Sequence, residues 1–323
     1  MIPVLVTAVG SELACAVIKA LQHSVLADRL RLVGCDTGAE VIGGQWCAVF
    51  TQVPAAREEA AYLDAIDALI TAHRIRILIP TADAEIALLA RHKDRLKAQL
   101  GCHVLVNDAE ELSRFEDKWT AHLWYLEHGI AAPQTWLADS IGELERQLQP
   151  GHFPLVLKPR KGGGARSVYR IDTFDELRTH LPVVQQPIVQ RLVGSGDEEY
   201  TAGTFTGRQG GVRVLVLKRT LKFGMTNTAE TVADENLAAF CRQVVGKTRL
   251  RGANNIQFRI GDDGPTVIEI NPRFSGTAGI RAHFGFNDVE MAICDALEQP
   301  IREPHITPGR VLRYMHEYYV TRG

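Results

Sequence analysis

The chain has 323 residues, 46% of them hydrophobic and 23% charged, so it is long enough to bury the cores of two or three domains. Its net charge of -2 gives no electrostatic basis for binding nucleic acid or an anionic membrane surface. No apolar run approaches the length of a membrane span, and six scattered cysteines without a Cys-x-x-Cys pair argue against a zinc site or a disulfide framework. We therefore expect a cytoplasmic protein with reduced thiols that binds neither nucleic acid nor membrane.

Residues 1–112 alternate between apolar runs and amphipathic stretches, which predicts a parallel sheet with helices on both faces. The arrangement is Rossmann-like, but Gly10 is a single glycine where a dinucleotide motif needs three, so we favour a scaffold without a dinucleotide. Asp36, after the second strand, either contacts a small ligand at the sheet edge or forms a turn. Residues 1–6 lack a basic leader and are interpreted as the start of the first strand, not as a signal peptide. Strands are expected at 4–8, 30–35, 76–80 and 103–107, and helices at 12–22, 57–73 and 83–100.

The second region, residues 113–187, begins with a junction at 113–118 and mixes helices with strands. A helix at 119–128 is expected to end before Gly129, because glycine favours the C-cap conformation. Ser140 and Glu143 have the spacing of a capping box at the start of another helix. Further helices are expected at 140–149 and 173–180, and strands at 153–159 and 167–171.

Strands dominate the third region, residues 188–323, which predicts an α+β fold with an antiparallel sheet. The segment 261–264, Gly-Asp-Asp-Gly, separates two apolar runs and predicts a hairpin turn. Strands are expected at 188–192, 200–206, 212–219, 255–260 and 266–271, and a helix at 233–245.

The last of these strands carries polar residues inside an apolar run. If residues 267–271 form a strand, its period of two places Glu269 and Asn271 on one face and Ile268 and Ile270 on the other. Two oxygen ligands on one face are suited to Mg²⁺, and Arg273 could grip a phosphate or a carboxylate. The alternative is an edge strand whose polar face is solvated.

A glycine-rich segment with basic residues follows the strand at 153–159. Gly162, Gly163 and Gly164 would let backbone N–H groups approach an anion closely. The segment joins two strands and lacks the Gly-Lys-Ser/Thr ending, so it is not a P-loop. The alternative is a flexible hairpin whose charges are solvated. The basic residues are Lys158, Arg160, Lys161 and Arg166.

A third polar segment begins at Gln190 and ends at Tyr200. The strand end could offer backbone N–H and C=O groups to an adenine edge, and an acid after the Gly-rich turn could accept from ribose hydroxyls. An ordinary acidic hairpin would have the same pattern.

Taken in order, these motifs resemble the ATP-grasp superfamily, and most of all the branch that includes the carbamoyl-phosphate synthase large subunit and the carboxylate–amine ligases. The resemblance covers nearly the whole chain, because segments 33–36 and 78–83 are similar to the Rossmann-like domain that precedes the ATP-grasp fold in that branch. It implies that such a domain is followed by a two-subdomain ATP-grasp fold, with a small lid subdomain at 113–187 and a metal-binding subdomain at 188–323. The motifs that carry it are Asp117-Lys118, Lys158-Pro159 with its glycines, Gln190 with Glu199-Tyr200, Gln257, and Glu269-Ile270-Asn271-Pro272-Arg273.

The resemblance also implies a role for each matching residue. Glu198 is the rival of Glu199 for the ribose, since a shift of one residue would exchange them. Many family members have an acid where this chain has Gln190, but an amide can still accept a hydrogen bond from the adenine amino group. The implied roles are phosphate binding for Lys118 and Lys158, closure over the phosphates for Gly162, Gly163 and Gly164, adenine contact for Gln190, Arg191, Leu192 and Val193, ribose contact for Glu199, Mg²⁺ coordination for Gln257, Glu269 and Asn271, and contact with the transferred phosphoryl group for Arg273.

The implied activity is a ligase that uses ATP and Mg²⁺, for which Mn²⁺ can substitute, to join a small-molecule carboxylate to an amine or a thiol through an acyl phosphate. Arg273, Lys158 and Asn271 are the expected catalytic residues. The alternatives are a nucleotide-binding scaffold or regulatory protein of the same fold and, more remotely, an NAD-dependent enzyme. A homodimer is expected only because it is the commonest assembly. Further candidate substrate contacts are Lys218, Arg219, Lys222, Arg281 and His283.

Overall fold

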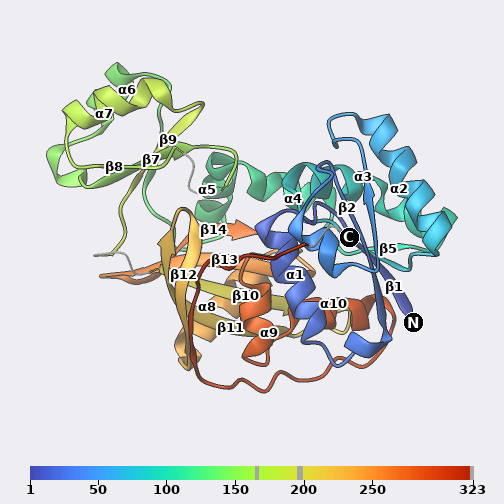
Figure 1. The fold of residues 1–323 in the computed structure, drawn as a ribbon. Coiled ribbons are helices and arrows are strands. Elements are labelled where there is room, and N and C mark those ends of the chain that lie inside the picture. Colours follow the sequence, from blue (N-terminus) through green and yellow to red (C-terminus); the bar gives the residue numbers. More distant parts are fainter. Residues whose placement is uncertain (164–166, 195–198, 321–323) are drawn as a thin grey trace.

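The computed structural model describes residues 1–163, 167–194 and 199–320, and its strands form three sheets (Figure 1). A parallel sheet and a large antiparallel sheet make up the body of the molecule, and a small antiparallel sheet with two helices projects from it (Figure 1). Gly164 and Glu198, two of the predicted ligand-binding residues, lie outside the described residues.

The first sheet is parallel and has helices on both faces, as predicted. Its strands are β1 (Ile2–Val6), β2 (Leu30–Asp36), β3 (Val49–Gln52), β4 (Ile77–Ile79) and β5 (His103–Val104), and its helices are α1 (Glu12–Gln22), α2 (Glu59–His73) and α3 (Asp83–Leu100). The strand order is β3-β2-β1-β4-β5. Val4 and Val6 pack in a core with α1, whereas Leu5 packs in a second core with α2 and α3. The bounds of α1 and α3 agree with the prediction because Ser11 caps the first and Gly101 ends the second in a left-handed conformation.

Two helices connect the first sheet to the rest of the chain: α4 (Ala109–Glu116) and α5 (Lys118–Glu127). The prediction treated 113–118 as a junction and missed α4. Its sequence is mostly polar, and it buries Glu111 and Phe115 alone. Phe115 belongs to the core beneath the third sheet, so α4 is stabilised by contacts that its own sequence does not reveal.

The small sheet is antiparallel, with strand order β6-β9-β7-β8. Both predicted helix starts are present, because the hydroxyls of Ser140 and Thr173 accept hydrogen bonds from backbone N–H groups three residues later. The elements of this unit are β6 (Thr135–Leu137), α6 (Ile141–Gln147), β7 (Leu155–Pro159), β8 (Tyr169–Ile171), α7 (Phe174–His180) and β9 (Pro187–Arg191).

The third sheet is antiparallel, as predicted, with strand order β14-β13-β10-β11-β12-β15. Its strands are β10 (Glu199–Thr206), β11 (Val212–Lys222), β12 (Met225–Val232), β13 (Gly252–Gly261), β14 (Gly264–Asn271) and β15 (Arg310–Leu312), and its helices are α8 (Glu235–Gly246), α9 (Ala278–His283) and α10 (Asp288–Ala296). The hairpin between β13 and β14 was predicted, whereas β12, β15, α9 and α10 were not. The core on one face includes residues of α4, α5 and α8.

The other face of this sheet changes from apolar to polar along its strands. At one end, Phe205, Leu217 and Ala253 pack against α1, α9 and α10. At the other end of the same face, Asn255 and Gln257 line a cavity. Because α1 also packs on the first sheet, it holds the two large sheets together and brings the carboxyl edge of the first sheet to this cavity.

A β-bulge interrupts β14 and corrects one prediction. Gln257 pairs with Glu269 but Phe258 pairs with Val267, so Ile268 is an extra residue in its strand. Val267 and Ile270 are buried in the core, whereas Ile268 lines the cavity beside Glu269. The predicted strict alternation is therefore wrong at Ile268.

Within the described part of the chain, none of the helices combines the length and the apolar character that crossing a bilayer requires.

Candidate active site

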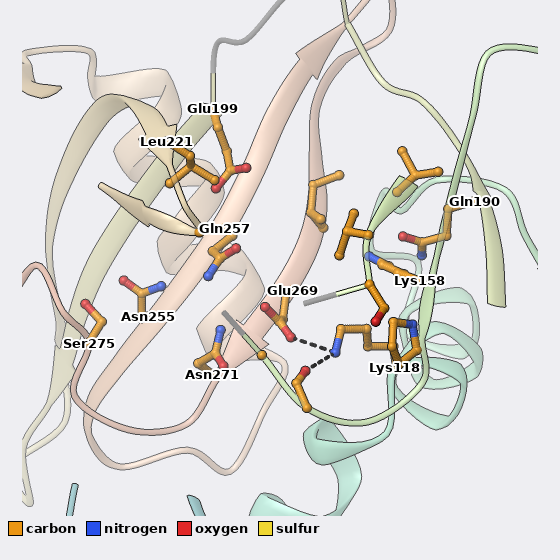
Figure 2. Close-up of a pocket in the computed structure, with 18 of the residues that line it drawn as sticks. Lys118, Lys158, Gln190, Glu199, Leu221, Asn255, Gln257, Glu269, Asn271 and Ser275 are labelled. Carbon is orange, nitrogen blue, oxygen red and sulfur yellow. Dashed lines mark hydrogen bonds and ion pairs between the residues drawn. The ribbon is translucent and has the colours of Figure 1, made fainter. Parts of the chain in front are cut away.

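A cavity of about 830 Å³ lies between the small sheet and the polar end of the third sheet (Figure 2). It also reaches Glu12 and Leu13 at the start of α1. Figure 2 shows Lys118, Lys158 and Gln190 on one side and Asn255, Gln257 and Asn271 on the other. Among the described residues, side chains from seven strands (β7 and β9 to β14) and two α-helices (α1 and α5) line this cavity. The predicted site residues that line the cavity are Lys118, Lys158, Gly162, Gly163, Gln190, Arg191, Leu192, Val193, Glu199, Gln257, Glu269, Asn271 and Arg273.

An ion pair positions the two lysines. Asp117 caps the start of α5 by accepting from two backbone N–H groups, and its carboxylate also accepts from Arg160 at 2.7 Å. The N–H of Lys118 donates to the backbone oxygen of Arg160 at 3.0 Å. The start of α5 is therefore fastened to the end of β7, which carries Lys158. Arg160, one of the basic residues of the glycine-rich segment, is thus paired with Asp117.

The Glu269 carboxylate lies beside both lysines. Lys118 Nζ is 3.3 Å from Glu269 Oε1 and donates to Gly162 O at 2.7 Å, as the dashed lines of Figure 2 show. Burial alone would raise the pKa of Glu269, but Lys118, Lys158, the Asn271 amide and Arg273 together bring the pKa below its ordinary value. Burial lowers the pKa of Lys158 to about 8, with Glu269 opposing that change.

The polar face of the β13–β14 hairpin carries four oxygen-bearing side chains in two directly opposed pairs. Gln257 faces Glu269, and Asn255 faces Asn271. The prediction missed Asn255, although its spacing of two from Gln257 in a strand was a signal for it. Asn255 Oδ1 accepts from the Thr201 hydroxyl at 2.8 Å, which fixes the orientation of its amide.

This set of side chains fits a Mg²⁺ ion that also binds phosphate oxygens and waters. It fits less well a metal ion whose ligands all come from the protein. No group of three or more His, Cys, Asp or Glu side chains that could hold a metal occurs among residues 1–163, 167–194 and 199–320. Glu269 supplies one carboxylate, and Gln257 and Asn271 supply amide oxygens. Mg²⁺ is commonly bound by one or two carboxylates, with phosphate oxygens and waters completing its octahedron.

Gln190 lies in the centre of the small sheet, and its amide has a defined orientation. Its Nε2 donates to the Thr135 hydroxyl at 2.9 Å, because that hydroxyl has used its own proton on Pro133 O at 2.8 Å. Gln190 Oε1 thus remains as an acceptor at the cavity wall. Since Gln190 is only 5% exposed, this acceptor is held in place.

The backbone beside Gln190 offers fewer groups than predicted. The N–H groups of Arg191 and Leu192 donate to Gln134 O at 2.9 Å and to Pro154 O at 3.1 Å. They are therefore not free to contact a base. Pro154 has no N–H group, so it cannot donate a hydrogen bond to the carbonyl group of Leu192 in return. That carbonyl group is therefore the better candidate for contact with the base.

The predicted ribose acid, Glu199, is paired with Arg219. The two lie directly opposite each other on β10 and β11, and the Arg219 guanidinium donates to Glu199 Oε1. Arg219 lines the cavity but is occupied by this ion pair, while Lys218 and Lys222 are not among the lining residues. The predicted substrate contacts at Lys218 and Lys222 are thus placed away from the cavity.

Arg273 bridges two parts of the chain. Its Nε donates to Asp83 Oδ1 at 2.7 Å at the start of α3, and its Nη1 donates to Phe274 O at 3.0 Å. The first sheet therefore orients the arginine that follows the proposed metal ligands. Asp36, in contrast, accepts from the N–H groups of Gly10 and Gly38, both at 2.8 Å, so the turn-forming alternative describes it.

Arg281 and His283 do not line the cavity, contrary to the prediction. Arg281 is fully buried and pairs with Asp288, which is also fully buried. Its Nη1 also donates to Ser275 Oγ at 2.9 Å and Thr277 Oγ1 at 2.6 Å, so it supports the cavity wall from behind. Gly203 makes room for it, because a Cβ there would lie 2.3 Å from Arg281 Nε.

Replacing Arg281 by Met should lower the free energy of unfolding by about 3–5 kcal/mol, because Asp288 would be left buried without its counter-charge. Urea denaturation followed by circular dichroism measures the change. The double variant Arg281→Met/Asp288→Leu is the control, and it should recover much of the loss. If the single variant is as stable as the unmodified chain, the pair has no structural role.

Comparison with known proteins finds a family model and several solved structures that are similar to this chain. Residues 196–317 match a family model described as "ATP-grasp in the biosynthetic pathway with Ter operon". The fold is similar to N5-carboxyaminoimidazole synthetase from Staphylococcus aureus complexed with ADP, with a TM-score of 0.77 and 12% identity over 97% of this chain and 82% of that one. It is also similar to L-amino acid ligase from Bacillus licheniformis, with a TM-score of 0.71 and 17% identity over 92% and 74% of the two chains.

A third similar structure is the biotin carboxylase domain of the Hydrogenobacter thermophilus 2-oxoglutarate carboxylase, in complex with MgADP and bicarbonate. Its TM-score is 0.72, with 15% identity over 95% of this chain and 73% of that one. These similarities extend over nearly the whole chain, so the predicted architecture, an ATP-grasp fold preceded by a Rossmann-like domain, is confirmed.

Proposed function

We propose that this chain, which has an ATP-grasp fold, is an ATP-dependent ligase that joins a small-molecule carboxylate to an amine through an acyl phosphate. One observation supports it above the others: a half-buried, ionised Glu269 faces Lys118 and Lys158 in a large cavity. A carboxylate for a metal and two ammonium groups for phosphates are what a nucleoside triphosphate needs at its reactive end.

Glu269, Asn271 and Gln257 would hold Mg²⁺, which supplies charge neutralisation at the β- and γ-phosphates when it is bound. The solved structures with ADP and MgADP support the choice of nucleotide and metal. Lys118 and Lys158 would bind phosphate oxygens, and Gln190 Oε1 would accept from the adenine amino group.

The reaction follows in two steps. A carboxylate oxygen of the substrate attacks the γ-phosphorus, the bond to the β,γ-bridging oxygen breaks, and ADP leaves. The amine nitrogen then attacks the acyl carbon, the bond to the phosphate oxygen breaks, and phosphate leaves with the electron pair while the nitrogen loses a proton. Arg273, held by Asp83, is placed to stabilise the charge on the transferred phosphoryl group. A thiol could take the place of the amine.

Replacing Gln190 by Leu should raise the KM for ATP about tenfold, since it removes the acceptor for the adenine amino group. The KM for GTP should change little, because guanine has a carbonyl group at that position. Initial rates of ADP or GDP formation measure both values. The control is Gln147→Leu, on the exposed face of α6. An unchanged ratio between ATP and GTP would exclude Gln190 from base recognition.

The function itself is tested by phosphate release from Mg²⁺-ATP with amino acids and small carboxylates, supplied singly and in pairs. Release only with a carboxylate and an amine together would establish a ligase and name its substrates. Release with a single compound would indicate self-ligation or a carboxylate kinase. ATP binding with no release across the panel would favour a nucleotide-binding scaffold.

A further inference from the structure

The cavity continues beyond the residues assigned to nucleotide and metal. Past Asn271 it is lined by Glu12 and Leu13 at the start of α1 and by the turn of residues 275–277. We call this part the acceptor end. Figure 2 shows Ser275 and Asn255 here, on the side of the cavity away from Lys158 and Gln190.

A distant segment of the chain reaches the residues of the acceptor end. After α10 the chain runs along the outside of the third sheet and adds β15 to the edge of β12 (Figure 1). The pairing continues one residue further, where the N–H of Arg313 donates to Asn227 O at 2.9 Å. Arg313 thus leaves the sheet beside the start of β12, where Met225 and Thr226 line the cavity.

The Arg313 side chain joins two walls of the acceptor end. Its Nη1 donates to Glu12 Oε1, and its Nη2 donates to Gly276 O at 3.0 Å. A planar guanidinium can make both bonds at once, whereas an ammonium acts as a single point charge. Gly276 allows the approach, because a Cβ at that position would lie 2.7 Å from Glu12 Oε1.

Arg281 holds the same turn from the opposite side through Ser275 and Thr277. The turn is therefore fixed from behind by Arg281 in the core and from the front by Arg313. Only the second contact depends on a partly exposed residue, since the Arg313 side chain is 30% exposed and Arg281 is fully buried.

We propose that Arg313 is a positioning residue for the substrate that is not the nucleotide: it sets the distance between Glu12 and the turn of residues 275–277. The inference rests on the proposed function. Loss of Arg313 frees the Glu12 carboxylate and the carbonyl group of Gly276, which changes the shape of the acceptor end and misplaces the acceptor relative to the phosphoryl group. The nucleotide contacts at Lys118, Lys158 and Gln190 come from other elements and are not affected.

The test compares Arg313→Ala and Arg313→Lys with the control Arg310→Ala, which removes an exposed arginine from β15, the strand that ends just before Arg313. Steady-state rates of phosphate release give separate KM values for ATP and for the carboxylate and amine found in the panel assay. In Arg313→Ala the KM for the carboxylate or the amine should rise about tenfold or more, with the KM for ATP unchanged. Arg313→Lys should recover part of the loss, and Arg310→Ala should behave as the unmodified chain.

A double-mutant cycle adds a readout that a loss of stability alone would not move. Glu12→Gln should raise the same KM. Combining it with Arg313→Ala should raise that KM little further, because both changes break the contact between Glu12 and Arg313. Equal effects on the KM values for ATP and acceptor, or additive effects of the two changes, would overturn the inference. If the unmodified chain releases no phosphate with any pair, the proposed function fails and the inference falls with it. If the unmodified chain turns over and Arg313→Ala keeps its KM values, only the inference fails.

Discussion

Replacing Glu269 by Gln is expected to reduce kcat for phosphate release by about 10³-fold or more, because it removes the one carboxylate among the proposed Mg²⁺ ligands. Gln257 and Asn271 contribute only neutral amide oxygens, so they cannot replace the lost charge. The variant should also need a higher Mg²⁺ concentration for half-maximal rate. A Mg²⁺ titration of phosphate release, with the same substrates as the unmodified chain, measures both effects.

Gln has nearly the same shape as Glu269 but leaves Lys118 and Lys158 with less counter-charge, so thermal unfolding of the variant is measured together with its activity. The matched control is Glu230→Gln, an exposed glutamate on β12 of the same sheet, which should keep full activity. Full phosphate release by Glu269→Gln at ordinary Mg²⁺ concentration would falsify the metal assignment.

The affinity for ATP is expected to fall as the pH rises through about 8, the pKa to which burial brings Lys158. The sign follows from the charge: the ammonium attracts phosphates, and the neutral amine does not. If only the charged form binds, the KM for ATP should rise about tenfold between pH 7 and pH 9. KM values from initial rates at half-unit steps of pH measure the profile.

Lys158→Met should give a weak affinity, reduced about 100-fold at pH 7, and a profile without this step. Lys222→Met is the control, since Lys222 is exposed and does not line the cavity; it should keep the step. A step of the same size in Lys158→Met would assign the titration to another group.

The same pKa has the opposite consequence for folding. Between pH 8 and 10.5, the ordinary value for lysine, the unfolded chain binds a proton at Lys158 that the folded chain does not bind. The contribution of Lys158 to the free energy of unfolding therefore increases with pH in this window. Binding and stability should thus move in opposite directions.

The sequence predicted those parts of the fold that local signals determine. Ser140 and Thr173 mark helix starts by side-chain caps, and the Gly-Asp-Asp-Gly segment at 261–264 marks a hairpin. Alternation of strands and helices was sufficient for the parallel sheet. These signals act within a few residues of each other, so they can be read without knowledge of the tertiary structure.

The missed features depend on contacts between distant residues. Helix α4 is polar and is stabilised through Phe115, and β12 consists largely of Thr and other polar residues that pair with β11. The bulge at Ile268 is a property of two strands in register and not of either strand alone.

The candidate site shows the same division. Period two on β14 correctly placed Glu269 and Asn271 together, because both follow the bulge. Residue type and position suggested Arg281 as a substrate contact, but Arg281 is buried in an ion pair with Asp288. Only the tertiary structure reveals that Arg219, Arg160 and Arg273 are each occupied by a carboxylate from another element.

Arg281 occupies the space that Gly203 leaves, so substitutions at these two positions, 78 residues apart, depend on each other. Any side chain at 203 would meet the guanidinium, since even a Cβ lies 2.3 Å from Arg281 Nε. A mutation at 203 can therefore be fixed only after, or together with, the replacement of Arg281, and the loss of Arg281 in turn leaves Asp288 without a counter-charge. Positions 203, 281 and 288 are therefore expected to change together, so relatives that keep Arg281 must also keep Gly203.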